Sequence, residues 1–160
     1  MNADTPHDRN SPTASANNVP VDRLAGTWQI LSVVTKDQIN GTEREPFGPS
    51  PVGYLIYTRD GRVMTMIAAA GRPHLPSDRR PSETELAGAF MSAAGYAGRY
   101  TINGDQIVHQ IEVCTLPNWS GVTQIRHLAM EGEKLMLTTP RLDTPAIGDV
   151  RWSMVWKRAV

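Results

Sequence analysis

The stretch L-A-G-T-W-Q-I-L-S-V-V-T, residues 24–35, is the first part of the chain that can bury a continuous apolar face. It passes from a glycine and a tryptophan into β-branched residues, which is typical of a half-buried strand. Gly26 permits a close backbone approach, and Trp28 carries the largest apolar surface of any side chain. We therefore predict a strand over residues 25–36 around which the rest of the chain folds.

The length of the chain predicts a single domain, and its charge balance indicates which partners to expect. The chain has 160 residues, enough for a single core, and 16 basic side chains balance 16 acidic ones. This balance predicts neither a nucleic-acid partner nor a membrane surface as partner. Residues 1–20 are polar and are expected to be a disordered tail, followed by one domain over residues 21–160. The single cysteine, Cys114, and the absence of an apolar signal segment predict a cytoplasmic protein.

A hairpin is predicted directly after the first loop. Residues 54–58 and 62–68 are apolar runs joined by Arg59-Asp60-Gly61, and Asp-Gly is a strong hairpin signal. If Asp60 and Gly61 are the two turn residues, then Tyr57 opposes Met64 and Leu55 opposes Met66. Those four side chains would then share one face of the sheet.

One helix is expected among the strands. Ser82-Glu83-Thr84-Glu85 is a capping box, which predicts a helix that begins there and ends near Ala94. Its apolar stripe includes Leu86 and Phe90, and we expect it to cover the open end of the strands. The proline-rich loop over residues 40–51, which carries Phe47, is expected to form part of the rim.

The remaining strands complete an all-β fold. Turn residues separate five further apolar runs: residues 98–102, 106–114, 122–130, 133–139 and 149–158. Eight strands with short antiparallel connections, and one helix inserted after the third, favour an up-and-down barrel. A two-sheet sandwich is the alternative, although its crossovers normally need longer links.

Several motifs resemble the lipocalin-like domain family of bacteria and fungi. They are G-x-W at residues 26–28, G-P-S-P-V-G-Y-L-I-Y-T-R-D-G-R-V-M at 48–64, L-P-N-W-S-G-V-T-Q-I-R at 116–126 and L-M-L-T-T-P at 135–140. The resemblance implies a calycin-type β-barrel with a pocket for a small, largely apolar molecule. It also implies that Trp28 closes the barrel floor beneath Arg158, as a cation–π pair. For G-x-W alone, an ordinary core tryptophan is the alternative.

Alternation along two strands places polar groups inside this barrel. Ile107, His109, Ile111 and Val113 form one face and are predicted to point inward. On the strand over 122–130 we choose as interior the face with Gln124 and Arg126. A guanidinium there needs a partner, so Arg126 is a hypothetical anchor for a ligand carboxylate, enolate or carbonyl. Backbone carbonyls, an unrecognised acid or buried water are the alternatives.

The leading functional hypothesis is binding of a small, mostly apolar molecule with a polar or acidic end. The predicted ligand-binding residues are Tyr54, Tyr57, Met64, Met66, Phe90, His109, Trp119, Gln124 and Arg126. The alternative is a cofactor-free isomerase or cyclase acting on a polyketide- or terpenoid-like substrate, with His109 and Arg126 as catalytic residues. In that role His109 is expected to titrate near neutral pH. A third alternative is an interaction module whose barrel is filled with side chains.

No cofactor and no metal site is predicted, because the four histidines are scattered and no metal-ligand or phosphate-loop motif is present. The expected partner is a small hydrophobic molecule, and a homodimer is left open.

Overall fold

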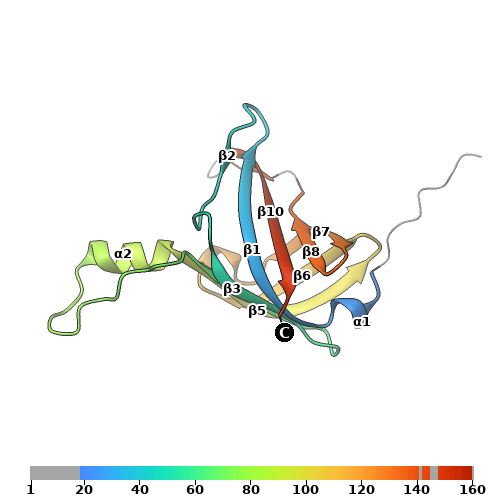
Figure 1. Ribbon diagram of the computed structural model, residues 1–160, viewed down its shortest axis with the longest axis horizontal. Helices are drawn as coiled ribbons and strands as arrows, with labels where there is room; N and C mark the ends of the chain where they lie inside the picture. Colours follow the sequence, from blue (N-terminus) through green and yellow to red (C-terminus); the bar gives the residue numbers. More distant parts are fainter. Residues whose placement is uncertain (1–18, 141, 145–147, 160) are drawn as a thin grey trace, which may run out of the picture.

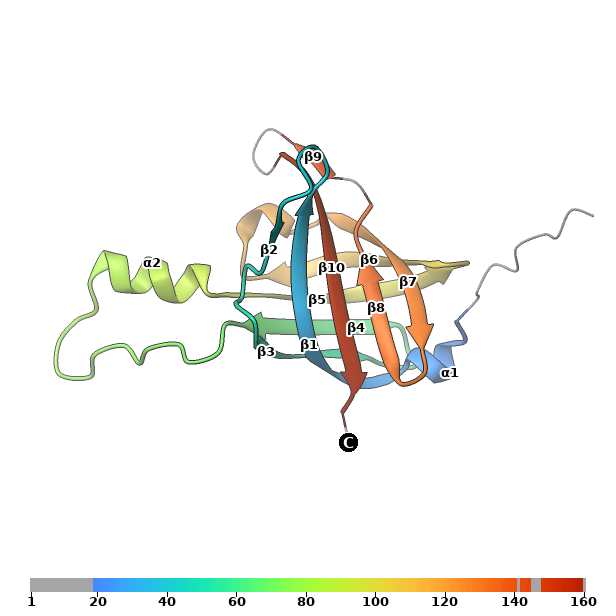
Figure 2. The same cartoon turned by 45° about the horizontal axis from the view of Figure 1, so that its top comes forward.

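The computed structural model describes residues 19–140, 142–144 and 148–159, so most of the predicted tail lies outside the described residues. Within these ranges the strands form one antiparallel sheet that closes into an eight-stranded barrel, as predicted (Figures 1 and 2). Around the barrel, the neighbours are β1 (Gly26–Asp37), β3 (Val52–Tyr57), β4 (Arg62–Ala68), β5 (Ala93–Asn103), β6 (Gln106–Cys114), β7 (Thr123–Glu131), β8 (Lys134–Thr138) and β10 (Gly148–Arg158). Pairing of β1 with both β3 and β10 closes the barrel.

Two short strands lie in segments that the sequence indicated only as loops. β2 (Glu43–Arg44) pairs with β1, and β9 (Leu142–Thr144) pairs with β10. In the same region Phe47, predicted to lie at the rim, is only 8% exposed and packs in the core. No described helix has the length and apolar character needed to span a membrane.

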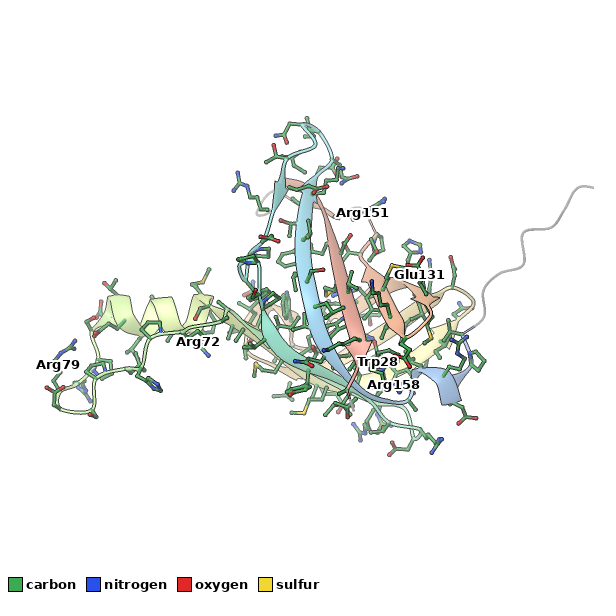
Figure 3. All side chains as sticks on the ribbon, in the orientation of Figure 1. Trp28, Arg72, Arg79, Glu131, Arg151 and Arg158 are labelled. Carbon is green, nitrogen blue, oxygen red and sulfur yellow. The ribbon has the colours of Figure 1, made fainter. Side chains whose placement is uncertain are left out.

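The closed end of the barrel is built on Trp28, as the resemblance implied. The side chain is fully buried and donates Nε1–H to Leu24 O at 2.8 Å, the last residue of the short helix α1 (Val21–Leu24). The Arg158 guanidinium carbon lies 4.1 Å from the centroid of the Trp28 ring. Arg158 also donates to the carbonyls of Ala25, at 2.8 Å, and Arg23. Figure 3 shows Trp28 and Arg158 together at the end of β10 next to α1.

Gly26 is required by this arrangement. Its φ is +132°, and a Cβ atom added here would overlap the Arg158 guanidinium. Gly26→Ala is therefore expected to lower the free energy of unfolding by more than about 1 kcal/mol, measured by urea denaturation. Gly104→Ala is the matched control, since Gly104 also has a positive φ but open space around it. Equal losses in the two variants would mean that backbone strain alone, and not the guanidinium, constrains Gly26.

The predicted hairpin forms, but its register differs from the prediction. Tyr57 pairs with Val63 and Leu55 pairs with Thr65, because the loop contains three residues, Arg59–Gly61. Thr58 N–H donates to Arg62 O at 2.9 Å, and Gly61 has a φ of +85°. A three-residue loop with a left-handed glycine is the second common hairpin solution. The prediction that Met64 and Met66 share a face with Tyr57 is therefore wrong, since shifting a register by one residue reverses the face.

The predicted helix forms as α2 (Glu83–Met91) with its capping box, in which Ser82 Oγ accepts from Glu85 N–H. It does not cover the open end, which corrects the prediction. Ala69 N–H donates to Ser92 O at 2.9 Å, so the β4–β5 hairpin continues past the barrel and carries α2 outward. Residues 69–92 form an arm on the side of the barrel opposite α1 (Figures 1 and 2). No residue of α2 is buried.

Candidate ligand-binding site

The inward face of β6 is the starting point of the site. Ile107 and His109 are fully buried and Ile111 is 2% exposed, which agrees with the predicted alternation. The predicted inward position of Val113 is wrong, because this side chain is 63% exposed. A bulge is the reason: Ala97 pairs with Val113 and Gly98 with Ile111, which leaves Glu112 as an extra residue. An extra residue moves all later side chains to the other face.

Two tyrosines contact the buried imidazole, one on each nitrogen. Tyr57 Oη lies 2.8 Å from His109 Nε2, and Tyr96 Oη lies 2.6 Å from His109 Nδ1. Tyr57 is 1% exposed and comes from the β3 end near the closed floor, where it pairs with Gly26. Tyr96 comes from the part of β5 nearer the arm and pairs with Thr65. The Tyr57–His109–Tyr96 chain therefore crosses the interior from the floor towards the opposite end.

The imidazole in this chain is neutral at physiological pH. Burial, and secondarily the positive charge of Arg126, lower the pKa of His109 to about 3. The expectation that His109 titrates near neutral pH is therefore wrong. Burial also raises the pKa of Tyr57 and of Tyr96, so both phenols keep their protons. Tyr57, His109 and Tyr96 are therefore three uncharged side chains, each of which can donate and accept a hydrogen bond.

Arg126 brings the positive charge of the site. It lies on the half-buried face of β7 with Gln124, and Leu128 on the same face is 3% exposed, so the predicted inward face is confirmed. Its guanidinium donates to Gln124 Oε1 and, at 3.1 Å, to Ile125 O. Gln124 is the cross-strand partner of His109. Among the described residues no carboxylate lies within 4 Å of this guanidinium.

Several inward-facing side chains keep part of their surface accessible. They are Tyr96, Gln124, Arg126, Trp152 and Met154, all half-buried. The inward face towards α1 differs, because Trp28, Tyr57 and Trp156 are at most 1% exposed. Arg126 and Tyr96 are therefore partly accessible to solvent, whereas the side chains of the floor are not. Trp119, in the 3-10 turn Pro117–Trp119, packs edge-on against Tyr96 with ring centroids 6.1 Å apart.

The structure brings together some of the sequence-predicted site residues. Tyr57, His109, Gln124 and Arg126 lie in the interior, with Trp119 beside them. Tyr54, Met64 and Met66 are 54%, 57% and 49% exposed on the outer face of β3 and β4. Tyr54 alternates with the buried Leu55 and Tyr57 along β3, and the hairpin register places Met64 and Met66 on the face of Tyr54. Phe90 is 45% exposed on the arm.

Two polar residues of the interior were not found by sequence reasoning. Tyr96 precedes the predicted start of its strand, although its spacing from the buried Tyr100 places both on one face. Thr65 is 7% exposed, and its Oγ1 makes no hydrogen bond to the described residues. The predicted hairpin register, with Met64 and Met66 on the face of Tyr57, placed Thr65 on the opposite, outer face.

One relative is the 4'-hydroxy-3'-methoxypropiophenone carrier protein ppsC of Aspergillus oryzae (strain ATCC 42149 / RIB 40), which is 32% identical over 66 residues. The match covers 36% of this chain and 60% of that protein's length.

Two solved structures are similar over most of the chain. A lipocalin-like protein from Bacteroides uniformis ATCC 8492 gives a TM-score of 0.43 at 13% identity, covering 86% of this chain and 99% of that one. An uncharacterised protein from Bacteroides eggerthii DSM 20697 gives a TM-score of 0.41 at 9% identity, covering 84% of this chain and 98% of that one.

The family model described as a lipocalin-like domain matches residues 25–159. Because this match spans the whole barrel, the chain belongs to the lipocalin-like domain family.

Proposed function

We propose that the protein binds a small, mostly apolar molecule inside the barrel, with an electron-rich oxygen of that molecule placed against Arg126. The observation that carries this proposal is an inward-facing, half-buried guanidinium that no described carboxylate neutralises. Removing such a group from water is costly unless it is paired, and a carbonyl, carboxylate or phenolate oxygen would pair it. Apolar walls with a few convergent polar groups are the usual composition of ligand sites.

The carrier relative suggests a chemical class for the first probe. Its name contains an aromatic ketone, 4'-hydroxy-3'-methoxypropiophenone, and the matched segment is 32% identical to this chain. An aryl ketone combines an apolar ring with an acceptor oxygen, which suits the interior described above. We propose a carrier role for this chain on that basis, in a reducing compartment such as the cytoplasm, since Cys114 is the single cysteine of the sequence.

Binding of 4'-hydroxy-3'-methoxypropiophenone is expected to quench tryptophan fluorescence, with Trp119 next to the site as a reporter. Arg126→Ala is expected to weaken binding by more than about tenfold, because it removes a charged hydrogen-bond donor worth about 1.5–3 kcal/mol. Arg151→Ala is the matched control, since Arg151 is exposed near the far end of β10 (Figure 3). Equal affinities for wild type and Arg126→Ala would contradict the anchor role.

A cofactor-free isomerase or cyclase is the second candidate, and the Tyr57–His109–Tyr96 chain is the observation that favours it. The Tyr96 hydroxyl would donate a hydrogen bond to the ketone oxygen and stabilise the enolate that forms as solvent water removes a proton from the neighbouring carbon, while His109 and Tyr57 hold this phenol in place. Turnover is expected to appear as deuterium exchange next to the ketone in D2O, followed by NMR, and to be lost in His109→Gln. If the ketone bound to wild type exchanges only at the uncatalysed rate, the isomerase or cyclase role is contradicted and only the carrier role remains.

A further inference from the structure

The hydrogen bonds of the Tyr57–His109–Tyr96 chain have only two consistent directions. A neutral imidazole carries one N–H and one lone pair, so it donates to one tyrosine and accepts from the other. In the first arrangement Tyr57 O–H donates to Nε2, and Nδ1–H donates to Tyr96 Oη. In the second arrangement Tyr96 O–H donates to Nδ1, and Nε2–H donates to Tyr57 Oη.

Burial of Tyr57 separates these two arrangements. In the second one the Tyr57 hydroxyl hydrogen needs another acceptor, yet Tyr57 is 1% exposed and His109 is its single hydrogen-bond partner among the described residues. A buried donor without a partner is destabilising, because it has lost its hydrogen bond to water and gained none. The first arrangement leaves every hydrogen of Tyr57 and His109 bonded. It also leaves the Tyr96 hydroxyl hydrogen free at the half-buried end of the chain.

We infer that Tyr96 is a second hydrogen-bond donor to the ligand. Together with Arg126 it selects an oxygen that only accepts, such as that of a ketone or carboxylate, over a hydroxyl, whose own hydrogen would face two donors. This inference rests on the proposed function and deepens it, because it names the group that the site recognises. Tyr57 and His109 act as positioning residues, since they orient the Tyr96 hydroxyl without touching the ligand. Thr65, the strand neighbour of Tyr96, adds a buried hydroxyl that has no partner among the described residues.

The first experiment determines, without any ligand, which of the two hydrogen-bond arrangements of Tyr57, His109 and Tyr96 is present. Nitrogen-15 NMR of labelled protein near neutral pH is expected to show His109 as the neutral Nδ1–H tautomer, with Nε2 as the acceptor. His109→Gln identifies the signal by its disappearance. The Nε2–H tautomer would overturn the inference, because Tyr96 would then use its hydrogen on the imidazole.

The selectivity is tested with two probes that differ at one carbon. They are 4'-hydroxy-3'-methoxypropiophenone and the alcohol obtained by reducing its ketone. Wild type is expected to bind the ketone more tightly, and Tyr96→Phe is expected to lose about tenfold of ketone affinity and most of that preference. Phenylalanine keeps the ring that packs on Trp119. Tyr100→Phe is the matched control, because it also removes a hydroxyl that donates a 2.7 Å hydrogen bond, to Thr58 O near the closed end.

The outcomes separate the two proposals. Ketone binding that Arg126→Ala weakens, with an unchanged ketone-to-alcohol ratio in Tyr96→Phe, overturns the inference and leaves the proposed function. Failure of wild type to bind either probe, or carboxylate analogues of them, overturns both.

Discussion

Replacing Trp28 with alanine is expected to lower the free energy of unfolding by about 3–5 kcal/mol, the usual cost of truncating a large buried aromatic side chain. The ring is fully buried, donates a hydrogen bond to Leu24 O and lies beneath the Arg158 guanidinium. Its loss opens a cavity at the floor and removes the hydrogen bond from Trp28 to α1. Urea denaturation measures the loss, and Trp119→Ala, at a half-buried turn, is the control with a smaller expected effect.

The Arg158 contact adds a test of coupling. Arg158→Ala is expected to cost about 1–3 kcal/mol, because it removes the cation–π contact and two hydrogen bonds to backbone carbonyls. The double variant is expected to lose less than the sum of the single losses, since alanine at position 28 leaves the guanidinium no ring to cover. Strict additivity would show that the two side chains do not stabilise each other. Ligand affinity of folded Arg158→Ala is expected to stay near that of wild type.

Acid is expected to destabilise the protein through His109. The pKa of this imidazole is about 3 in the folded state, while an unfolded chain has the ordinary value near 6.5. Below pH 6.5, His109 binds a proton in the unfolded state but stays neutral in the folded state. The free energy of unfolding therefore falls as the pH falls, down to about pH 3. At pH 4.5 the loss due to this group is about 2–3 kcal/mol relative to neutral pH.

Comparing pH profiles isolates this contribution from the carboxylates. His109→Gln keeps a donor and an acceptor but cannot be protonated, so its unfolding free energy is expected to fall less steeply between pH 6.5 and 4.5. His74→Gln, on the exposed arm, is the matched control for replacing a histidine outside the barrel. Parallel profiles for wild type and His109→Gln would mean that the imidazole is not protected from protonation in the folded state.

The hairpin shows how far local signals extend. Asp60-Gly61 correctly predicted a turn, but the same residues suit a two-residue and a three-residue loop. Only pairing with the neighbouring strands selects the register. The consequence for function was large, because one residue of shift moved Met64 and Met66 outward and Thr65 inward.

The arm shows a different limit. The capping box predicted the beginning of α2 correctly, because Ser82 and Glu85 satisfy backbone and side-chain groups within one turn. Where a helix lies is not a local property. The direction of the β4–β5 hairpin carries α2 away from the barrel, so Phe90 does not reach the interior.

The closed end of the barrel followed from the family resemblance. The sequence by itself determined the eight strands, their turns and the inward direction of His109, Gln124 and Arg126. Those features depend on alternation, turn residues and motifs that lie within a few positions of one another. Only the tertiary structure decided which side chains contact His109 and whether its imidazole is charged. The contact of Tyr57 and Tyr96 with one imidazole joins residues 52 and 13 positions apart, and the burial that keeps His109 neutral arises only when the barrel closes around it.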